Sequence, residues 1–282
     1  QGSDECGRWR MIPAAYDYKV AESAEQANSL LGEYGDESKL LAGGHSLIPM
    51  MKFRLAAPTV LIDVARISDL SYIREADGHL AIGAMTKHYE VETSAVVAQH
   101  APMLAHVAAL VGDPSVRHRG TLGGTLAHSD PASDLPAAVL ALGGTIVAQG
   151  PNGTREIAAN EFFTGYFESV LAADEILTEV RIPTGTGGWN YQKFNRRAQD
   201  WAIVGVGVAD GGKGISLVNM GSTPIRATAA EEAIASGATA ADAAALAAQG
   251  TEPPQDNNAD AAYRTHLATV LTRRALEAAG VA

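Results

Sequence analysis

The chain has 282 residues, 32 of them acidic and 21 basic, so its formal net charge at pH 7 is −11. Apolar residues make up 46% and charged residues 19%, which is typical of a folded globular protein and excludes a largely disordered one. The acidic balance, with Lys and Arg scattered, excludes a basic surface for nucleic acid. We find no apolar run that could span a membrane and no signal segment, and we therefore expect a cytoplasmic protein.

The single cysteine, Cys6, limits the redox chemistry that this chain can perform alone. One cysteine permits neither an internal disulfide nor a cysteine-ligated iron–sulfur cluster within the chain. Any redox function therefore requires a bound organic cofactor. Cys6 lies in residues 1–10, before the more usual start Met11-Ile12-Pro13, and we expect these residues to be an extension or an expression remnant outside the fold.

In chain order, the first unit, residues 11–66, has a mixed α/β pattern. Apolar residues three and four positions apart predict a helix over 21–34. Short apolar runs predict strands at 39–42 and 59–63, separated by a turn, with one more strand before the helix. This unit is expected to be a small α/β lobe.

The second unit, residues 67–184, begins with two strands joined at Asp77-Gly78, a dipeptide typical of hairpins. Helical periods and a glycine-rich stretch follow. The predicted elements are strands at 72–74 and 79–83, helices at 86–98 and 101–112, a loop at 120–124, a helix from Leu135, a strand at 146–148, a turn at 151–153 and a strand at 176–183.

The third unit, residues 185–282, follows the apolar-free stretch 184–188, which suits a flexible connector. Its predicted elements are strands at 190–195, 202–209 and 214–219 with a turn at Gly211-Gly212, and then an Ala-rich helical region broken at Pro253-Pro254.

The first candidate site is a pair of glycines, in Ala42-Gly43-Gly44-His45-Ser46, after an apolar run. Two glycines let the backbone approach a ligand closely, and successive N–H groups can bind an anion such as pyrophosphate. The alternative is a simple turn after a strand, which is the commoner role of such a pair.

The second candidate site lies in 117–136 and includes Thr121-Leu122-Gly123-Gly124-Thr125 and Asp134. Two arginines precede these glycines and aspartates follow them. Backbone donors and hydroxyls suit phosphate, and a downstream carboxylate suits ribose or ribityl hydroxyls. The alternative is a glycine-rich loop before a helix, in which Asp134 is an acid in the first turn, where the helix dipole favours it.

Other common site motifs are not present. The sequence contains no P-loop, no G-x-S-x-G elbow and no H-E-x-x-H pattern. Gly205-Val206-Gly207 resembles the start of a dinucleotide fingerprint but lacks the third glycine, and we interpret it as a buried strand. The spacing of His128 and Asp130 favours hydrogen bonding in a loop over a metal site, and no metal is expected.

Read together, the two glycine motifs, about 78 residues apart, resemble those of the FAD-binding medium subunits of molybdenum hydroxylases, the xanthine dehydrogenase family. Within this family the likeness is greatest to aerobic carbon monoxide dehydrogenases. The segments that carry the resemblance are 42–52, Thr121–Thr125, Asp130-Pro131, Asp134, Met11-Ile12-Pro13, Arg181-Ile182-Pro183, Tyr263-Arg264 and Arg273-Arg274-Ala275.

The resemblance implies an α+β fold: a two-lobed α/β FAD-binding domain of the vanillyl-alcohol-oxidase or PCMH type, followed by a smaller α+β C-terminal domain. It implies that the two glycine loops hold the FAD pyrophosphate, that Asp134 binds FAD hydroxyls, and that Leu177, Lys193 and Trp201 lie near the flavin ring. The residues expected to bind FAD are Ala42, Gly43, Gly44, His45, Ser46, Thr121, Gly123, Gly124, Thr125, Asp134, Leu177, Lys193 and Trp201.

Two positions depart from the family pattern and affect what is expected around the flavin. Relatives often have Gly-Asp-Tyr where this chain has Gln199-Asp200-Trp201, and often have Asn where it has Thr125. These departures leave pyrophosphate binding intact but change the surroundings of the flavin, on which its potential and its acceptor depend. The alternative role for Trp201 is a core aromatic at the start of a strand.

The function implied by the resemblance is electron transfer within a complex. FAD would take electrons from [2Fe-2S] clusters of a small subunit, after oxidation of the substrate at a molybdopterin-type molybdenum cofactor in a large subunit, and pass them to a quinone or similar acceptor. A dimer of heterotrimers is expected, in the cytoplasm or at the inner face of the membrane through the complex. The alternatives are a subunit of an N-heterocycle or purine hydroxylase, a self-sufficient flavin oxidase of the same fold, and a non-catalytic binding protein.

Overall fold

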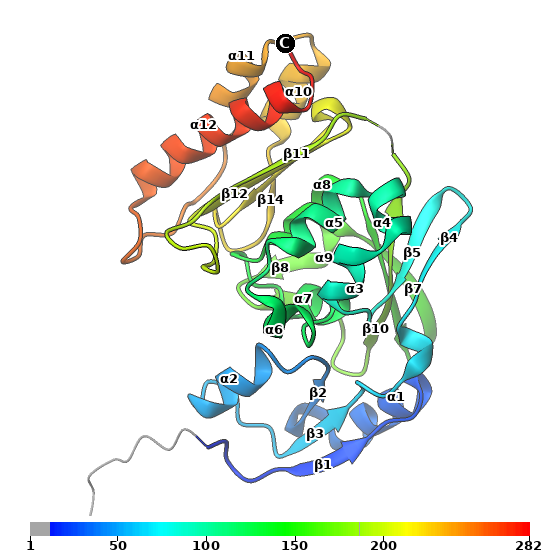
Figure 1. Ribbon diagram of the computed structural model, residues 1–282. Helices are drawn as coiled ribbons and strands as arrows, with labels where there is room; N and C mark the ends of the chain where they lie inside the picture. Colours follow the sequence, from blue (N-terminus) through cyan, green and yellow to red (C-terminus); the bar gives the residue numbers. More distant parts are fainter. Residues whose placement is uncertain (1–11, 186) are drawn as a thin grey trace, which may run out of the picture.

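The computed structural model describes residues 12–185 and 187–282 (Figure 1). The prediction for residues 1–10, including Cys6, therefore falls outside the described residues. The described residues form a three-stranded, a five-stranded and a four-stranded sheet, with a two-stranded ribbon beside them. Figure 1 shows the three large sheets one above the other, with the first lobe at the bottom and the C-terminal sheet at the top.

The first lobe is a parallel sheet in the order β1-β3-β2. Its helix α1 begins where the Ser23 hydroxyl accepts a hydrogen bond from the backbone N–H of Gln26, and it ends at Gly35, which has a φ of 52°. The elements are β1 (Asp17–Val20), α1 (Ala24–Tyr34), β2 (Ser38–Leu41), α2 (Leu47–Lys52) and β3 (Val60–Asp63). The segment predicted as a turn between the last two strands contains α2.

The second lobe is an antiparallel sheet in the order β4-β5-β10-β6-β7, with helices packed against it. The strands are β4 (Ile73–Ala76), β5 (His79–Gly83), β6 (Thr145–Gly150), β7 (Gly153–Ala158) and β10 (Ile176–Pro183), and the ribbon is β8 (Phe163–Gly165) and β9 (Glu168–Ser169). The helices are α3 (His88–Thr93), α4 (Ala95–His100), α5 (Pro102–Ala109), α6 (Pro114–Arg117), α7 (Leu122–His128), α8 (Asp134–Ala141) and α9 (Ala159–Phe162).

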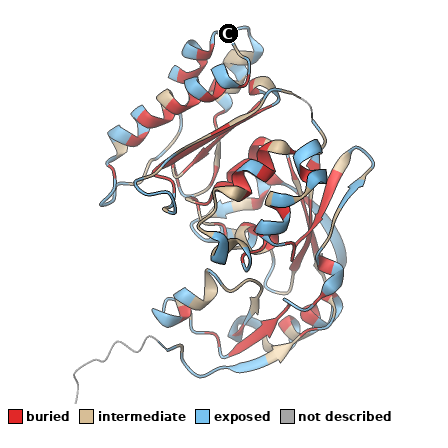
Figure 2. Ribbon diagram, in the orientation of Figure 1, coloured by how far each residue is buried: buried red, intermediate tan, exposed pale blue. Residues whose placement is uncertain are grey.

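The C-terminal part is an antiparallel sheet in the order β11-β12-β13-β14, against which both its own helix α12 and α8 of the second lobe pack. Its elements are β11 (Asn190–Phe194), β12 (Val204–Ala209), β13 (Gly214–Val218), β14 (Ile225–Arg226), α10 (Thr228–Ala235), α11 (Ala240–Ala245) and α12 (Ala261–Ala278). All six residues of β12 are buried, as the buried-strand interpretation of this segment predicted. Figure 2 shows buried residues concentrated on the strands and on the inner faces of the helices.

The predicted α+β fold class is therefore confirmed, but besides α2 two further helical segments differ from their prediction. The helix expected over 86–98 is divided at Ser94, whose hydroxyl accepts from the N–H of Val97 and starts a new helix, α4. The expected loop at 120–124 is the start of α7, because Thr121 caps that helix. Both differences arise from local capping by a side chain, which apolar periodicity does not report.

No helix among the described residues is both long enough and apolar enough to cross a membrane.

Candidate functional site

The first glycine loop joins β2 to α2, and its shape requires both glycines. A Cβ on Gly43 would lie 2.3 Å from the carbonyl oxygen of Arg119, so this residue lets the first lobe touch the second. Gly44 has a φ of 76°, in the left-handed region that favours glycine. The glycine pair is thus both a turn and a point of close approach between segments far apart in the sequence.

The same loop presents a row of unused backbone donors. Within residues 12–185 and 187–282, the backbone N–H groups of residues 43–47 donate no hydrogen bond, whereas Ile48 donates to the carbonyl of Gly44 at 3.1 Å. Successive free backbone N–H groups are the donors from which anion-binding sites are built. The loop can therefore bind an anion such as a phosphate group.

The second glycine motif has a different role, because its backbone donors already have acceptors. The N–H of Leu122 donates to Thr86 at 2.9 Å, and that of Gly123 donates to Ala84 at 2.8 Å. The N–H of Gly124 donates to the Thr121 hydroxyl at 3.1 Å, and that of Thr125 to the Thr121 carbonyl, also at 3.1 Å. This motif offers a ligand its hydroxyls and its close-packed surface rather than a row of free N–H groups.

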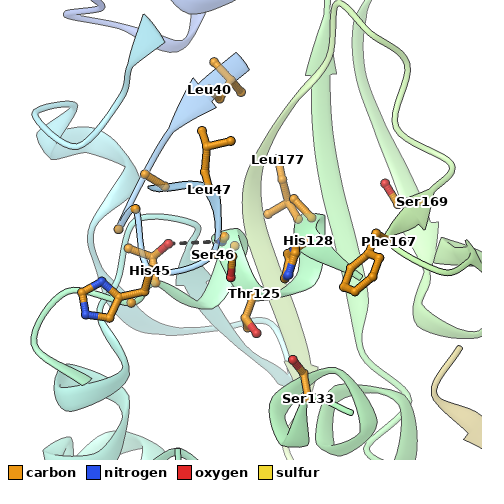
Figure 3. A pocket seen from close by; sticks show the side chains of 18 of the residues that line it. Leu40, His45, Ser46, Leu47, Thr125, His128, Ser133, Phe167, Ser169 and Leu177 are labelled. Atoms are coloured by element: carbon orange, nitrogen blue, oxygen red, sulfur yellow. Dashed lines mark hydrogen bonds between the residues drawn. The ribbon is translucent and has the colours of Figure 1, made fainter. Parts of the chain in front are cut away.

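The two motifs meet at a cavity of about 820 Å³ between the first lobe, the second lobe and the C-terminal sheet. Figure 3 shows side chains of the first lobe, among them Leu40 and Leu47, facing Thr125, His128 and Leu177 of the second lobe. All thirteen residues predicted to bind the cofactor line this cavity: Ala42, Gly43, Gly44, His45, Ser46, Thr121, Gly123, Gly124, Thr125, Asp134, Leu177, Lys193 and Trp201.

The cavity has further walls that sequence reasoning missed. One comes from Val111 and Gly112 after α5, and another from Phe167 and Ser169 at the β8–β9 ribbon. Phe167 packs beside the His128 ring, with the ring centroids 5.0 Å apart. The only local signal for this second wall is the short Gly165–Glu168 turn, which by itself does not indicate a ligand.

Asp134, Tyr191 and Lys193 form a buried polar cluster at the cavity wall. The Tyr191 hydroxyl donates to Asp134 Oδ1 at 2.7 Å, and Lys193 Nζ donates to Asp134 Oδ2 at 2.8 Å. Burial raises the pKa of Asp134, while the Lys193 ammonium opposes that rise. Asp134 is the first residue of α8, as the alternative interpretation predicted, and it also joins α8 to β11.

His88 lines the cavity beneath Gly120 and is only 4% exposed. Burial lowers its pKa to about 4, and the nearby charges of His45 and Arg117 act in the same direction. Its Nδ1 atom is buried and has no hydrogen-bond partner among the described residues. The imidazole is therefore neutral near pH 7.

Trp201 lies on the loop between β11 and β12 and is 59% exposed. The core-aromatic alternative for this residue is therefore wrong. Asn219 donates from Nδ2 to the carbonyl of Ala202 at 2.9 Å, and Arg264 donates to that of Ile203. These bonds fix the segment that follows Trp201, and Trp201 itself lines the cavity.

Asp130 lies in the turn between α7 and α8, two residues after His128. In residues 12–185 and 187–282, no group of three or more His, Cys, Asp or Glu side chains is arranged to hold a metal ion. Asp130 instead accepts a hydrogen bond from the N–H of Ala132 at 2.9 Å, within its own turn.

Comparison with known families identifies the class of protein that this fold and cavity define. Residues 14–185 match the FAD binding domain in molybdopterin dehydrogenase, and residues 189–279 match the CO dehydrogenase flavoprotein C-terminal domain. The chain is thus an FAD-binding subunit of an oxidoreductase. More particularly, it belongs to the family of medium, FAD-binding subunits of molybdenum hydroxylases.

Individual relatives are similar over almost the whole chain. The carbon monoxide dehydrogenase medium chain of Hydrogenophaga pseudoflava is 40% identical, covering 95% of this chain and 98% of the relative. Subunit alpha of the 6-hydroxypseudooxynicotine dehydrogenase complex of Paenarthrobacter nicotinovorans is 37% identical, covering 94% of this chain and 95% of the relative. A solved structure of carbon monoxide dehydrogenase from Hydrogenophaga pseudoflava superimposes with a TM-score of 0.90 at 41% identity, covering 95% of this chain and 98% of the solved chain.

The residues of the cavity fit FAD. The free N–H groups of 43–47 suit a pyrophosphate, and the hydroxyls of Ser46, Thr125 and Ser133 suit a polyol chain. Leu40 and Leu177 supply apolar wall for a ring system. The volume of about 820 Å³ lies within the range of small-molecule and cofactor pockets.

Proposed function

We propose that the cavity is the FAD site and that each of its walls contacts a different part of the cofactor. The loop at 42–46 holds the pyrophosphate, Thr121–Thr125 packs against it, and the C-terminal residues Lys193 and Trp201 face the flavin. The observation that carries the proposal is the row of five free N–H groups in residues 43–47, at the wall of the cavity that gathers both glycine motifs.

The chemistry of this subunit comes from the cofactor, and the chain supplies its binding and its surroundings. Bound FAD accepts two electrons and releases them singly or as a pair, which suits a junction between carriers of different kinds. The first glycine loop fixes the position of the anionic part. His88 stays neutral because it is buried, so it adds no positive charge to the wall near pH 7.

We infer the partner subunits from the single cysteine of this chain and from its relatives, which are subunits of larger complexes. With one cysteine in the sequence, the chain cannot ligate an iron–sulfur cluster alone. We propose that a small subunit supplies [2Fe-2S] clusters and that a large subunit supplies the molybdopterin-type molybdenum cofactor. In this scheme a dimer of heterotrimers passes electrons through this subunit to a quinone or a similar acceptor.

For the substrate, we propose carbon monoxide, supported by 40% identity to a carbon monoxide dehydrogenase medium chain. A second candidate is an N-heterocyclic substrate, supported by the 37% identical subunit of a 6-hydroxypseudooxynicotine dehydrogenase complex. Substrate selection belongs to the molybdenum-bearing partner, so the two candidates predict the same FAD site in this chain.

The test is anaerobic reduction of the flavin in the purified complex. We expect carbon monoxide to bleach the visible flavin absorption, and a quinone added afterwards to restore it. Bleaching by an N-heterocycle or a purine but not by carbon monoxide would favour the second candidate. Bleaching of the isolated, FAD-loaded chain by a small substrate would contradict the electron-transfer role and indicate a self-sufficient oxidase.

A further inference from the structure

The buried cluster at the cavity wall joins two parts of the molecule. Asp134 is 4% exposed and begins α8 of the second lobe, while Tyr191 and Lys193 lie two residues apart on β11 of the C-terminal sheet. Residues two apart on a strand point to the same face, so both side chains reach Asp134 from one side. Each oxygen of the carboxylate accepts one of these donors.

The Lys193 ammonium has a third contact, at the end of a helix. Nζ donates to the carbonyl of Leu110 at 3.1 Å, and Leu110 is the C-cap of α5, where the helix dipole favours a cation. An ammonium has three N–H donors. Two are used by Asp134 and Leu110, and none of the described residues accepts the third, while Lys193 lines the cavity.

The ionisation of the cluster suits this arrangement. Burial raises the pKa of Tyr191 well above its usual value, and the charge of Asp134 adds to the rise, so Tyr191 remains a hydroxyl donor. A cation as buried as Lys193, whose side chain is 7% exposed, needs a paired anion to be stable. Asp134 is the anion that contacts it.

We propose that Asp134 and Tyr191 are positioning residues: they hold the Lys193 ammonium so that its remaining donor faces an electron-rich atom of the cofactor. Asp134 then acts through Lys193 rather than by binding cofactor hydroxyls itself. The donor is in place only when β11 is docked on α8, so the C-terminal sheet completes the site. This inference rests on the proposed FAD site.

A double-mutant cycle distinguishes action through Lys193 from direct binding by Asp134. The variants are D134N, K193M and the double variant D134N/K193M, each in the full chain assembled with its partner subunits. The two readouts are the dissociation constant of FAD, from fluorescence titration of the apo-complex, and the reduction potential of the bound flavin.

We expect K193M to weaken FAD binding by about tenfold or more, as loss of a hydrogen bond from a charged donor does. The flavin potential should fall, because reduced flavin carries more negative charge and has lost a nearby cation. D134N alone should change both readouts in the same direction. D134N in the K193M background should change neither by more than about twofold, because the residue through which it acts is gone.

We expect K193M and D134N/K193M, the two variants on which the test depends, to fold, because neither leaves an unpaired buried charge. Without Lys193, Asp134 can protonate, since its burial already favours the neutral form, and Asn has nearly the same shape as a protonated Asp. Y191F removes one hydroxyl that is directed at Asp134 and should shift the potential in the same direction as D134N, but by less. K193R, which keeps the cation, should recover part of the loss.

The control is the exposed pair Lys213 and Asp210, which has the same 2.8 Å contact away from the cavity. D210N should leave FAD affinity and potential unchanged. Equal losses from D134N with and without Lys193 would overturn the inference and restore Asp134 as a direct ligand. Failure of the wild-type complex to bind FAD would instead overturn the proposed function.

Discussion

Gly43 lies where the first lobe touches the second, and its lack of a side chain permits that contact. In Gly43→Ala the new Cβ would lie 2.3 Å from the Arg119 oxygen, so the loops must separate. We expect a loss of roughly 1–3 kcal/mol in the free energy of unfolding, together with weaker FAD binding. Urea unfolding and FAD titration measure the two effects.

The matched control is Gly32→Ala in α1, where a Cβ would meet nothing within 4 Å. Alanine is the better helix former, so this variant should be more stable by about 0.5–1 kcal/mol and should bind FAD normally. If Gly43→Ala were as stable and as competent in binding as Gly32→Ala, the close contact between the lobes would be wrong.

His88 should make stability depend on pH. Its pKa is about 4 in the folded chain, against 6.5 for an unperturbed His, so between these values the unfolded state binds a proton that the folded state does not. The free energy of unfolding therefore falls as pH falls, by about 2 kcal/mol between pH about 7 and pH about 5 from this residue.

The measurement is urea unfolding at these two pH values for the wild type, His88→Gln and His266→Gln. His88→Gln should reduce the difference between the two pH values, whereas His266→Gln, at an exposed position of α12, should not. Burial also lowers the pKa of His128, so part of the dependence of the unfolding free energy on pH should remain in His88→Gln. An unchanged slope in His88→Gln would contradict a buried neutral imidazole.

At the residue scale, the thirteen residues predicted from the sequence all line one cavity, but the backbone donors expected from the second glycine motif are not free. Both motifs contain two glycines, yet only residues 43–47 have free N–H groups. The acceptors that occupy the second motif, Thr86 and Ala84, are supplied by a distant part of the chain. Local sequence does not reveal such tertiary partners.

At the element scale, α7 depends on the hydroxyl of Thr121, which accepts from the N–H of Gly124. Thr121→Ala should cost about 0.5–2 kcal/mol of stability and weaken FAD binding, because the start of α7 lines the cavity. Thr121→Ser should restore both. Thermal unfolding and FAD titration provide the comparison.

Thr239 provides the control, because its hydroxyl caps α11 through the N–H of Asp242, away from the cavity. Thr239→Ala should cost a similar free energy and leave FAD affinity unchanged. Equal loss of FAD affinity in both variants would mean that the effect reports general destabilisation rather than the cavity wall.

Element prediction succeeded where apolar spacing and glycine position carried the information. The helix predicted over 21–34 is α1 (Ala24–Tyr34), and the strand pair across Asp77-Gly78 is β4 and β5. The short helices α2 and α7 were missed because each begins directly after a glycine loop or at a capping Thr and is too short to show a period. Their formation depends on contacts with the rest of the fold.

At the scale of the whole molecule, three sheets contribute to the cavity, and the C-terminal sheet supplies Lys193 and Trp201. Ligand binding to the folded state alone raises stability, by about 2.7 kcal/mol when free ligand is at 100 times its dissociation constant. FAD should therefore raise the unfolding temperature of the chain in its complex. No shift at saturating FAD would indicate that the cofactor does not bind to the folded state.

The single cysteine bears on how the redox cofactors are distributed among the subunits of the complex. One cysteine cannot ligate an iron–sulfur cluster, so in the proposed scheme the clusters that deliver electrons to FAD lie on a partner subunit. We therefore expect the iron content of the purified complex to disappear when the small subunit is removed, while flavin remains with this chain. Iron retained by the isolated chain would contradict this division of labour.

The most direct test of the central claim is the flavin content of the purified complex, measured after release of the cofactor and compared with the amount of this chain. The proposed site predicts one FAD for each chain, and a large loss of FAD in Gly43→Ala but not in Gly32→Ala. A complex that contains this chain in full amount but no FAD would contradict the account.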